Sequence, residues 1–296
     1  MKKILITGAE GFVASYLSEE LKNDFEIEGG YFIKKNLPIK SFFLDVTEFS
    51  QVEEKIREGS YDAIFHLAGQ SSAKIAKVNS YDTYRINIFG ALNLAEAIIR
   101  HSIKTRLLFI STSDVYGNPK YLPVDENHPV SPLNAYSHSK LLAEDVLLGY
   151  SRKNLDLVIA RSFNHTGVGQ TVNFFIPSMI EQVKNSADGG TIHAGDLSLS
   201  RDFSDVRDVV NAYRKLLSVE KGIYNISSES SIKLSEIVNY IIKKSSKKIN
   251  VKQRPDLIRE GEPAEFYGTA AKLKSRIEWK RERTIFDTID WMMSDE

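Results

Sequence analysis

Cysteine is absent from this chain of 296 residues, so neither a disulfide bond nor thiol catalysis can contribute to it. The 39 lysines and arginines equal the 39 aspartates and glutamates, and this balance leaves no global field toward nucleic acid or an anionic membrane. No apolar run has the length of a membrane span, and the first residues are too short an apolar stretch for a signal peptide. We therefore expect a cytoplasmic protein with no nucleic-acid and no membrane partner.

Short apolar runs alternate with amphipathic segments along the first half of the chain, with predicted strands near 4–6, 25–31, 42–44, 62–67, 107–110 and 155–160. This alternation predicts an α/β fold in which helices cover both faces of a doubly wound parallel sheet. After Asn164 the rhythm breaks, which predicts a smaller mixed α/β domain. The expected sheet domain is 1–163 with 202–226 returning to it, and the smaller substrate domain is 164–201 and 227–296.

A glycine-rich turn follows the first predicted strand, with Gly8, Gly11 and Ala14 spaced Gly-x-x-Gly-x-x-Ala. Glycine lets the backbone turn tightly and lets a pyrophosphate approach the N-terminus of the next helix, while a small third residue permits close helix–strand packing. The turn therefore predicts a dinucleotide site at Gly8, Gly11, Phe12 and Val13. The alternative is a plain turn.

Strand ends and one helix supply the other predicted cofactor contacts, which are Asp45, Val46, Leu67, Ala68, Gly69 and Asn87. Asp45 either hydrogen-bonds the adenine or caps the helix from Glu48. The small residues after the fourth strand would let the backbone pass close to the cofactor. Asn87 either bridges its helix to the active-site backbone or faces solvent. His66 is expected to be a buried strand histidine, because nothing near it has metal-ligand spacing, and we predict no metal site.

The end of the second predicted strand bears on the choice of cofactor. An NAD site often carries a carboxylate about 20 residues after the glycines, where it binds the ribose hydroxyls. Here Tyr31 and Phe32 are followed by Lys34 and Lys35, with no carboxylate at that point. This pattern favours NADP over NAD. Solvated lysines on a loop are the alternative.

The stretch 107–140 carries the predicted chemistry, because an apolar strand ends in Ser-Thr-Ser and Tyr-x-x-x-Lys follows after a loop. Tyr136 and Lys140 lie one helical turn apart in a helix expected to start at Ser131-Pro132. A free phenol has a pKa of about 10, and a nearby ammonium group lowers it toward neutrality. The Thr112 hydroxyl could hold a carbonyl or alkoxide oxygen beside the phenol. The competing interpretation is a half-buried tyrosine with a solvated lysine.

With these residues in hand, the chain resembles the extended short-chain dehydrogenases/reductases, the NAD-dependent epimerase/dehydratase family. GAEGFVA, STSDVYG, YSHSK and RDFSDVRDVV carry the resemblance at the family's order and spacing. It implies a Rossmann domain with a small substrate domain, and a homodimer formed through helices at 81–100 and 132–149. By the match, Tyr136 is the acid–base phenol, Lys140 its partner and a ribose ligand, and Thr112 the hydroxyl that positions the sugar.

Within this group, the segment SFNHTGVGQ is similar to a run in GDP-6-deoxy-4-keto-D-mannose reductases, with Val168 in place of proline. The resemblance implies that a nucleotide-sugar substrate is held by five residues, which are Asn164, Arg201, Arg207, Arg259 and Glu262. Arginine suits a diphosphate because it makes bidentate contacts. The alternative for the arginines is a surface network with Asp202, Asp205 and Asp208.

Asp114 stands where dehydratases of this group carry the carboxylate, usually glutamate, that eliminates water. The similar reductases also have acidic residues there, so Asp114 joins Thr112, Tyr136 and Lys140 as a catalytic candidate. The resemblance implies NAD(P)H-dependent reduction of a nucleotide-linked 4-keto-6-deoxyhexose, with GDP-4-keto-6-deoxy-D-mannose as the expected substrate. The alternatives are a 4-epimerase or 4,6-dehydratase with tightly bound NAD, and a non-catalytic nucleotide-binding regulator.

Overall fold

The computed structural model describes residues 1–258 and 261–294. Its large sheet has seven parallel strands in the order β11-β6-β5-β4-β1-β2-β3. These strands are β1 Lys2–Thr7, β2 Phe25–Tyr31, β3 Lys40–Phe43, β4 Ala63–His66, β5 Arg106–Thr112, β6 Asp156–Ser162 and β11 Gly222–Ile226. The chain winds outward in one direction from β1 and in the other from β4, so the predicted doubly wound, Rossmann-like fold is confirmed.

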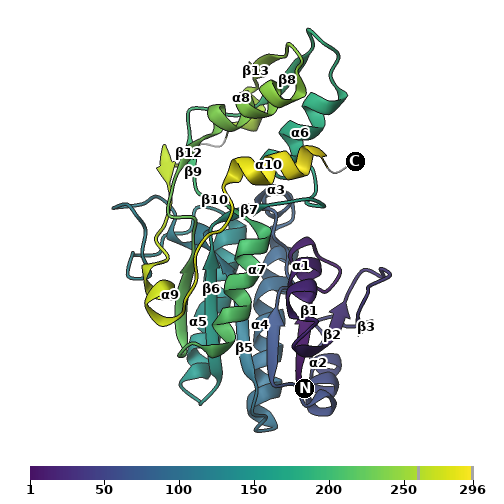
Figure 1. Cartoon of the computed structure of the whole chain (residues 1–296). Helices are drawn as coiled ribbons and strands as arrows, with labels where there is room; N and C mark the ends of the chain where they lie inside the picture. The colour runs from purple at the N-terminus through teal and green to yellow at the C-terminus, as the bar shows by residue number, and fades with distance from the viewer. Residues whose placement is uncertain (259–260, 295–296) are drawn as a thin grey trace.

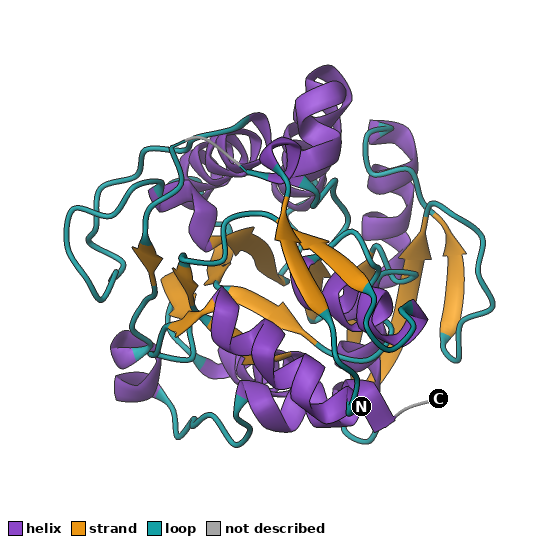
Figure 2. Cartoon of the chain, turned by 90° about the horizontal axis from the view of Figure 1, so that it is seen from above, coloured by secondary structure: helices purple, strands orange, loops and turns teal. Residues whose placement is uncertain are grey.

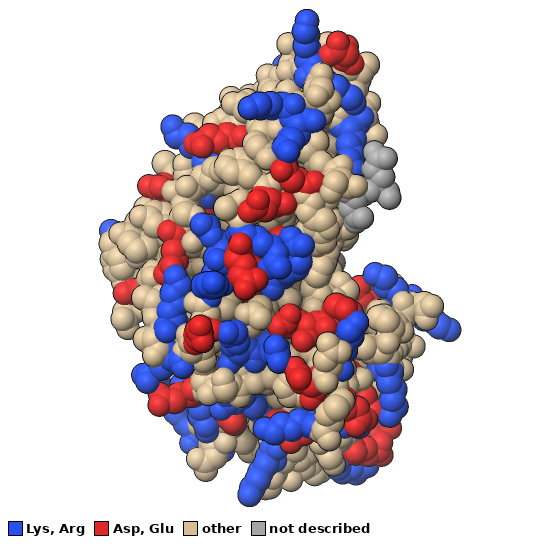
Figure 3. Space-filling model, viewed as in Figure 1, with Lys and Arg blue, Asp and Glu red and all other residues tan. Residues whose placement is uncertain are grey.

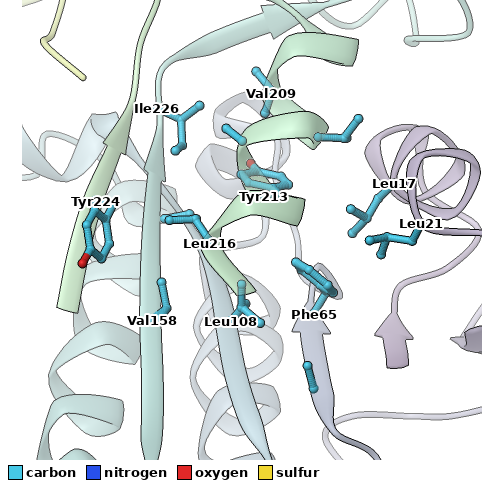
Figure 4. Close-up of a cluster of buried hydrophobic side chains, with 14 of the residues drawn as sticks. Leu17, Leu21, Phe65, Leu108, Val158, Val209, Tyr213, Leu216, Tyr224 and Ile226 are labelled. Carbon is cyan, nitrogen blue, oxygen red and sulfur yellow. The ribbon is translucent and has the colours of Figure 1, made fainter. Parts of the chain in front are cut away.

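Alternating side chains give the sheet two buried faces, since Ile4 and Ile6 point to one face and Leu5 to the other. Helices α1 and α7 pack on the first face (Figure 4) together with α9, and α2, α4 and α5 pack on the second. Their bounds are α1 Phe12–Leu21, α2 Phe49–Gly59, α4 Ser80–Arg100, α5 Ala135–Ser151, α7 Val206–Lys215 and α9 Ala271–Arg276, with α3 Ala73–Val78 beside α4 and α5. Burial on both faces explains why the central strands β1, β4, β5 and β6 each contain a short apolar run.

A second, smaller core lies above the carboxyl ends of the large sheet in Figure 1. It is built by α6 Phe175–Asn185, α8 Leu234–Ser245 and α10 Ile285–Ser294, and Figure 2 looks down on it. Three small sheets accompany it, in the orders β10-β7, β12-β9-β14 and β13-β8, and β8 contributes to the small core itself. Their strands are β7 Asn164–Thr166, β8 Thr191–Ala194, β9 Ser200–Arg201, β10 Phe203–Asp205, β12 Ile232–Lys233, β13 Asn250–Gln253 and β14 Glu265–Phe266. Between β10 and β12 the chain returns to the large sheet, where β11 pairs with β6. The predicted domain boundaries stay a prediction.

One predicted helix start is wrong. The expected N-cap at Ser131 and first helical residue at Pro132 lie in the preceding loop, and α5 begins at Ala135. Asn134 caps it instead, because its side chain accepts from the Ser137 backbone N–H while the Ser137 hydroxyl accepts from the Asn134 N–H. The two hydrogen bonds of this cap favour a helix start at Asn134 over one at Ser131-Pro132. They also fix the first turn of α5, which carries Tyr136.

Charges of both signs are mixed over the face shown in Figure 3, in keeping with the balanced composition. Among the helices of the described residues, none is both long and apolar enough to cross a membrane. The described part of the chain also contains no group of three or more histidine, aspartate or glutamate side chains placed to hold a metal ion.

Candidate active site

The glycine turn lies at the centre of the sheet, where the winding direction reverses. Gly8 has φ +68°, and the Gly11 N–H donates to the Gly8 carbonyl at 3.0 Å. A Cβ atom added to Gly8 would lie 2.8 Å from both the backbone N and the Cα of Ala68. Only glycine fits here, because the turn is left-handed and passes directly against the chain leaving β4. Ligands of open α/β sheets bind at such a switch point.

The N-terminus of α1 is suited to an anionic group. Gly11 is its N-cap and supplies no side-chain hydrogen bond, and the first turn contains no acidic residue. Phe12 and Val13, half-buried, form that turn. Backbone N–H groups left without side-chain caps at a helix start favour phosphate binding. The residues present therefore fit the pyrophosphate of a dinucleotide, although their roles stay predictions.

Replacing Gly8 by alanine should destabilise the fold by about 1–2 kcal/mol or more and weaken dinucleotide affinity at least about tenfold. The new Cβ would meet backbone, which cannot move aside as a side chain can. Gly149→Ala is the matched control: it lies in α5 with nothing within 4 Å of an added Cβ, and it should be neutral or slightly stabilising. Thermal unfolding and cofactor titration check both variants, and equal behaviour of the two would contradict this account.

Asn87 bridges α4 to the loop after β4, so the solvent-facing alternative is wrong. Its Oδ1 accepts from the Gln70 N–H at 2.9 Å, and its Nδ2 donates to the Gln70 carbonyl at 3.1 Å and to the Ser139 hydroxyl at 2.8 Å. A Cβ on Gly69 would lie 2.8 Å from Asn87 Oδ1. This buried amide thus ties the loop of Leu67, Ala68 and Gly69 to the helix that carries Tyr136 and Lys140.

His66 and Asp45 each form hydrogen bonds with a nearby threonine. His66 is fully buried at the end of β4, as predicted, and its Nδ1 shares a hydrogen bond of 2.8 Å with the Thr7 hydroxyl. Burial, with the charge of Lys140, lowers the pKa of His66 to about 3, so the ring stays neutral. Asp45 Oδ1 accepts from the N–H and hydroxyl of Thr47 and does not cap α2, whose N-cap is Glu48. The adenine contact of Asp45 and the cofactor contact of Val46, which is buried beside it, stay predictions.

Thr112, Asp114 and Tyr136 converge at the carboxyl end of β5. Thr112 ends the strand, its hydroxyl accepts from the Asp114 N–H at 3.1 Å, and it hydrogen-bonds the Tyr136 phenol. Burial raises the pKa of Tyr136, the Asp114 charge raises it further, and the Thr112 hydrogen bond opposes both. The predicted lowering of this pKa is therefore wrong for the structure in hand. The phenol is protonated at neutral pH and can act as a proton donor.

Lys140 lies one turn further along α5, with Nζ 4.3 Å from the centre of the Phe109 ring. Burial lowers the pKa of Lys140 to about 8, and the opposing charge of Glu144 limits the fall. Because Tyr136, Lys140 and Glu144 are spaced four apart, they occupy one face of α5. The solvated-lysine alternative is wrong, since Lys140 is only 7% exposed.

A buried ion pair lies beneath this face of α5 and was not predicted from the sequence. Glu144 is fully buried and accepts from Arg161, with Oε2 2.6 Å from one guanidinium nitrogen and 3.1 Å from Nε. The Ser111 hydroxyl also donates to Glu144, and the Arg161 guanidinium lies 4.9 Å from the Tyr116 ring centre. The available signals were an arginine inside the apolar run of β6 and a glutamate one turn after Lys140. The pair ties β5, β6 and α5 together below the candidate site.

The predicted substrate residues divide between two places. Asn164 is exposed at the start of β7, and its Nδ2 donates to the Asp202 carbonyl at 3.1 Å. The Arg201 guanidinium donates to Glu262 at 2.9 Å and to the Pro263 carbonyl at 2.9 Å, so Arg201 and Glu262 lie together. Arg259 lies outside the described residues. The substrate contacts of these four residues stay predictions.

Arg207 lies elsewhere, in a groove between α1 and α7 that is also lined by Tyr16 and Glu20. It makes a bidentate pair with Asp205, at 2.9 and 2.7 Å, and stacks 3.7 Å from the centre of the Trp291 ring. Asp205 is fully buried and caps α7. These contacts match the arginine–aspartate network that the sequence left open, while the diphosphate contact of Arg207 stays a prediction.

Comparison with known proteins identifies the class. Residues 5–292 match the model of the family described as GDP-mannose 4,6 dehydratase, so the chain belongs to this family within the epimerase/dehydratase group of extended short-chain dehydrogenases/reductases. With the fold and the site above, this makes it an NAD(P)-dependent nucleotide-sugar enzyme.

Individual relatives span the whole chain. A GDP-6-deoxy-D-mannose reductase of Pseudomonas aeruginosa is 32% identical over 99% of this chain and 97% of its own. The structure of RMD from the same organism, complexed with NADPH, is 30% identical, with a TM-score of 0.88 over 100% and 98% of the two chains. A UDP-Glc/GlcNAc 4-epimerase of Campylobacter jejuni is 25% identical, with a TM-score of 0.84 over 100% and 98%.

Proposed function

We propose that the protein reduces the 4-keto group of a nucleotide-activated 4-keto-6-deoxyhexose, and that GDP-4-keto-6-deoxy-D-mannose is its substrate. The observation that carries the proposal is the convergence of Thr112 and Tyr136 at the end of β5, on the sheet edge that also holds the Gly8 turn. The reductase relative from Pseudomonas aeruginosa and the similarity of the SFNHTGVGQ segment support the choice of sugar.

The proposed roles follow from the contacts. A bound NADH or NADPH supplies the hydride. Tyr136 gives its phenolic proton to the alkoxide oxygen that forms at C4, and the Thr112 hydroxyl stabilises that oxygen by a hydrogen bond. Asp114 keeps the phenol protonated, which suits a proton donor. Lys140 holds the cofactor ribose, and the charge of Glu144 favours the protonated form of its amino group.

At the other end of the substrate, Asn164 and Arg201 bind the nucleotide diphosphate in this proposal. Glu262 then acts on Arg201, because the carboxylate and the Pro263 carbonyl fix the guanidinium from one side. We also infer that two copies pair through α4 and α5, which pack side by side and leave Tyr81 and Phe89 of α4 exposed. The cytoplasmic location stays a prediction.

The direct test mixes the purified chain with GDP-4-keto-6-deoxy-D-mannose and NADH or NADPH, and follows loss of reduced-nicotinamide absorbance. We expect cofactor oxidation equal in moles to the sugar reduced. A folded protein that oxidises neither cofactor with this sugar would overturn the proposal.

A 4-epimerase is the second candidate, favoured by the whole-chain likeness to the Campylobacter jejuni epimerase. An epimerase returns its hydride to the sugar and so recycles NAD, whereas a reductase exchanges its cofactor at each turnover. Tightly held NAD in the purified protein, with interconversion of 4-epimers and no added cofactor, would favour this candidate.

A further inference from the structure

A carboxylate does stand at the carboxyl end of β2, although no residue of that strand end supplies it. Glu10 lies inside the glycine turn, and its side chain reaches across to the chain that leaves β2. Its Oε1 accepts from the backbone N–H of Phe32 at 2.9 Å and of Ile33 at 3.0 Å. The turn is also tied to β2 by the Ala9 N–H, which donates to the Gly30 carbonyl at 3.0 Å. The acid missing from the strand is thus replaced in space by one from the turn.

The second oxygen of this carboxylate lacks a hydrogen-bond donor within the described part of the chain. Glu10 Oε2 is buried, and no donor of the described residues reaches it. A buried carboxylate oxygen without a donor is costly, so such atoms are normally satisfied by a partner. In dinucleotide-binding sheets the group met at the end of β2 is the adenosine ribose, whose 2′-hydroxyl donates to a carboxylate.

We propose that Glu10 makes the site select NAD(H) over NADP(H). The inference rests on the proposed function only in requiring a dinucleotide cofactor. Two effects act together. The carboxylate already occupies the two backbone N–H donors, from Phe32 and Ile33, that a 2′-phosphate would need, and its negative charge repels that phosphate. A 2′-hydroxyl meets neither obstacle and satisfies the open acceptor.

The two lysines that favoured NADP have less influence on a 2′-phosphate than Glu10 has. Lys34 and Lys35 are exposed on the loop after β2, and the Lys35 ammonium lies 3.5 Å from the Glu10 backbone carbonyl. The charges of exposed lysines are screened by water and salt, while the carboxylate stands in direct contact with the donors in question. The preference predicted from the lysines is therefore reversed.

Binding of NADH and NADPH to the full chain, without sugar, tests the inference. Fluorescence titration of the wild type should give a Kd for NADH at least about tenfold below that for NADPH. Glu10→Gln keeps an oxygen for the Phe32 and Ile33 N–H groups but removes the charge, so the preference should shrink by about fivefold or more. Glu19→Gln removes the same charge two helical turns away in α1, and should leave the ratio unchanged.

A second measurement needs no variant and so does not depend on the folding of Glu10→Gln. Adenosine 5′-diphosphate should displace bound NADH at lower concentration than adenosine 2′,5′-bisphosphate. Equal or tighter binding of NADPH by the wild type, or an unchanged ratio in folded Glu10→Gln, would overturn the inference and leave the reductase proposal standing. Failure of both NADH and NADPH to bind would overturn the two together.

Discussion

Replacing Tyr136 by phenylalanine is expected to lower kcat by about a thousandfold and to leave the cofactor Kd within about twofold. The variant removes only the phenolic oxygen, which in this account gives the proton to the forming alkoxide. The half-buried ring keeps its packing, and Lys140 keeps its place beside Phe109. Steady-state kinetics and a cofactor titration on the same preparation check the expected split between turnover and binding.

Tyr150→Phe is the control for this substitution, because Tyr150 lies in the same helix and its hydroxyl donates to Glu96 at 2.6 Å. We expect this variant to keep the turnover of the wild type. If Tyr136→Phe kept more than about a tenth of the wild-type kcat, the phenol would not be the proton donor.

Replacing Glu144 by glutamine is expected to lower the free energy of unfolding by about 3–5 kcal/mol. The substitution preserves shape but leaves the Arg161 guanidinium charged and buried against a neutral partner. Arginine cannot escape by losing its proton, because the ordinary pKa of its guanidinium lies far above neutral pH. Denaturant unfolding of wild type and variant measures the loss.

Two further variants separate the ion pair from a general effect of charge removal. Glu19→Gln breaks an exposed pair with Lys22 and should leave the free energy of unfolding almost unchanged. Glu144→Gln combined with Arg161→Met removes both buried charges, and should recover part of the loss. A Glu144→Gln variant as stable as the wild type would show that the pair does not secure α5 to the sheet.

The central strands β1, β4, β5 and β6 were predictable because each is buried on both faces and contains a short apolar run. For 25–31 even the ends agree with β2. The start of α5 was not predictable from the sequence, because the choice between Ser131 and Asn134 as its cap depends on the path of the preceding loop. Strands of two or three residues, such as β9 and β12, have too few positions to show a period, and α10 was likewise not foreseen.

The candidate site shows the same division. Thr112, Tyr136 and Asn87 were placed by local spacing and strand ends, and the structure brings them to one sheet edge. The direction in which the Tyr136 pKa shifts could not be predicted from residue spacing, because it depends on burial of the phenol and on the nearby charge of Asp114. Glu10 was not recognised from the sequence for a related reason. A search for an acid at the end of a strand cannot see one that reaches there from a turn.

Transfer of deuterium from reduced cofactor to product tests the central claim most directly. With GDP-4-keto-6-deoxy-D-mannose and cofactor carrying deuterium at nicotinamide C4 on the transferred face, this account predicts one deuterium at C4 of each deoxyhexose formed. It also predicts one oxidised cofactor for each deuterium transferred. Recovery of the 4-keto sugar unreduced, without deuterium and without net cofactor oxidation, would contradict the claim that this chain is a reductase.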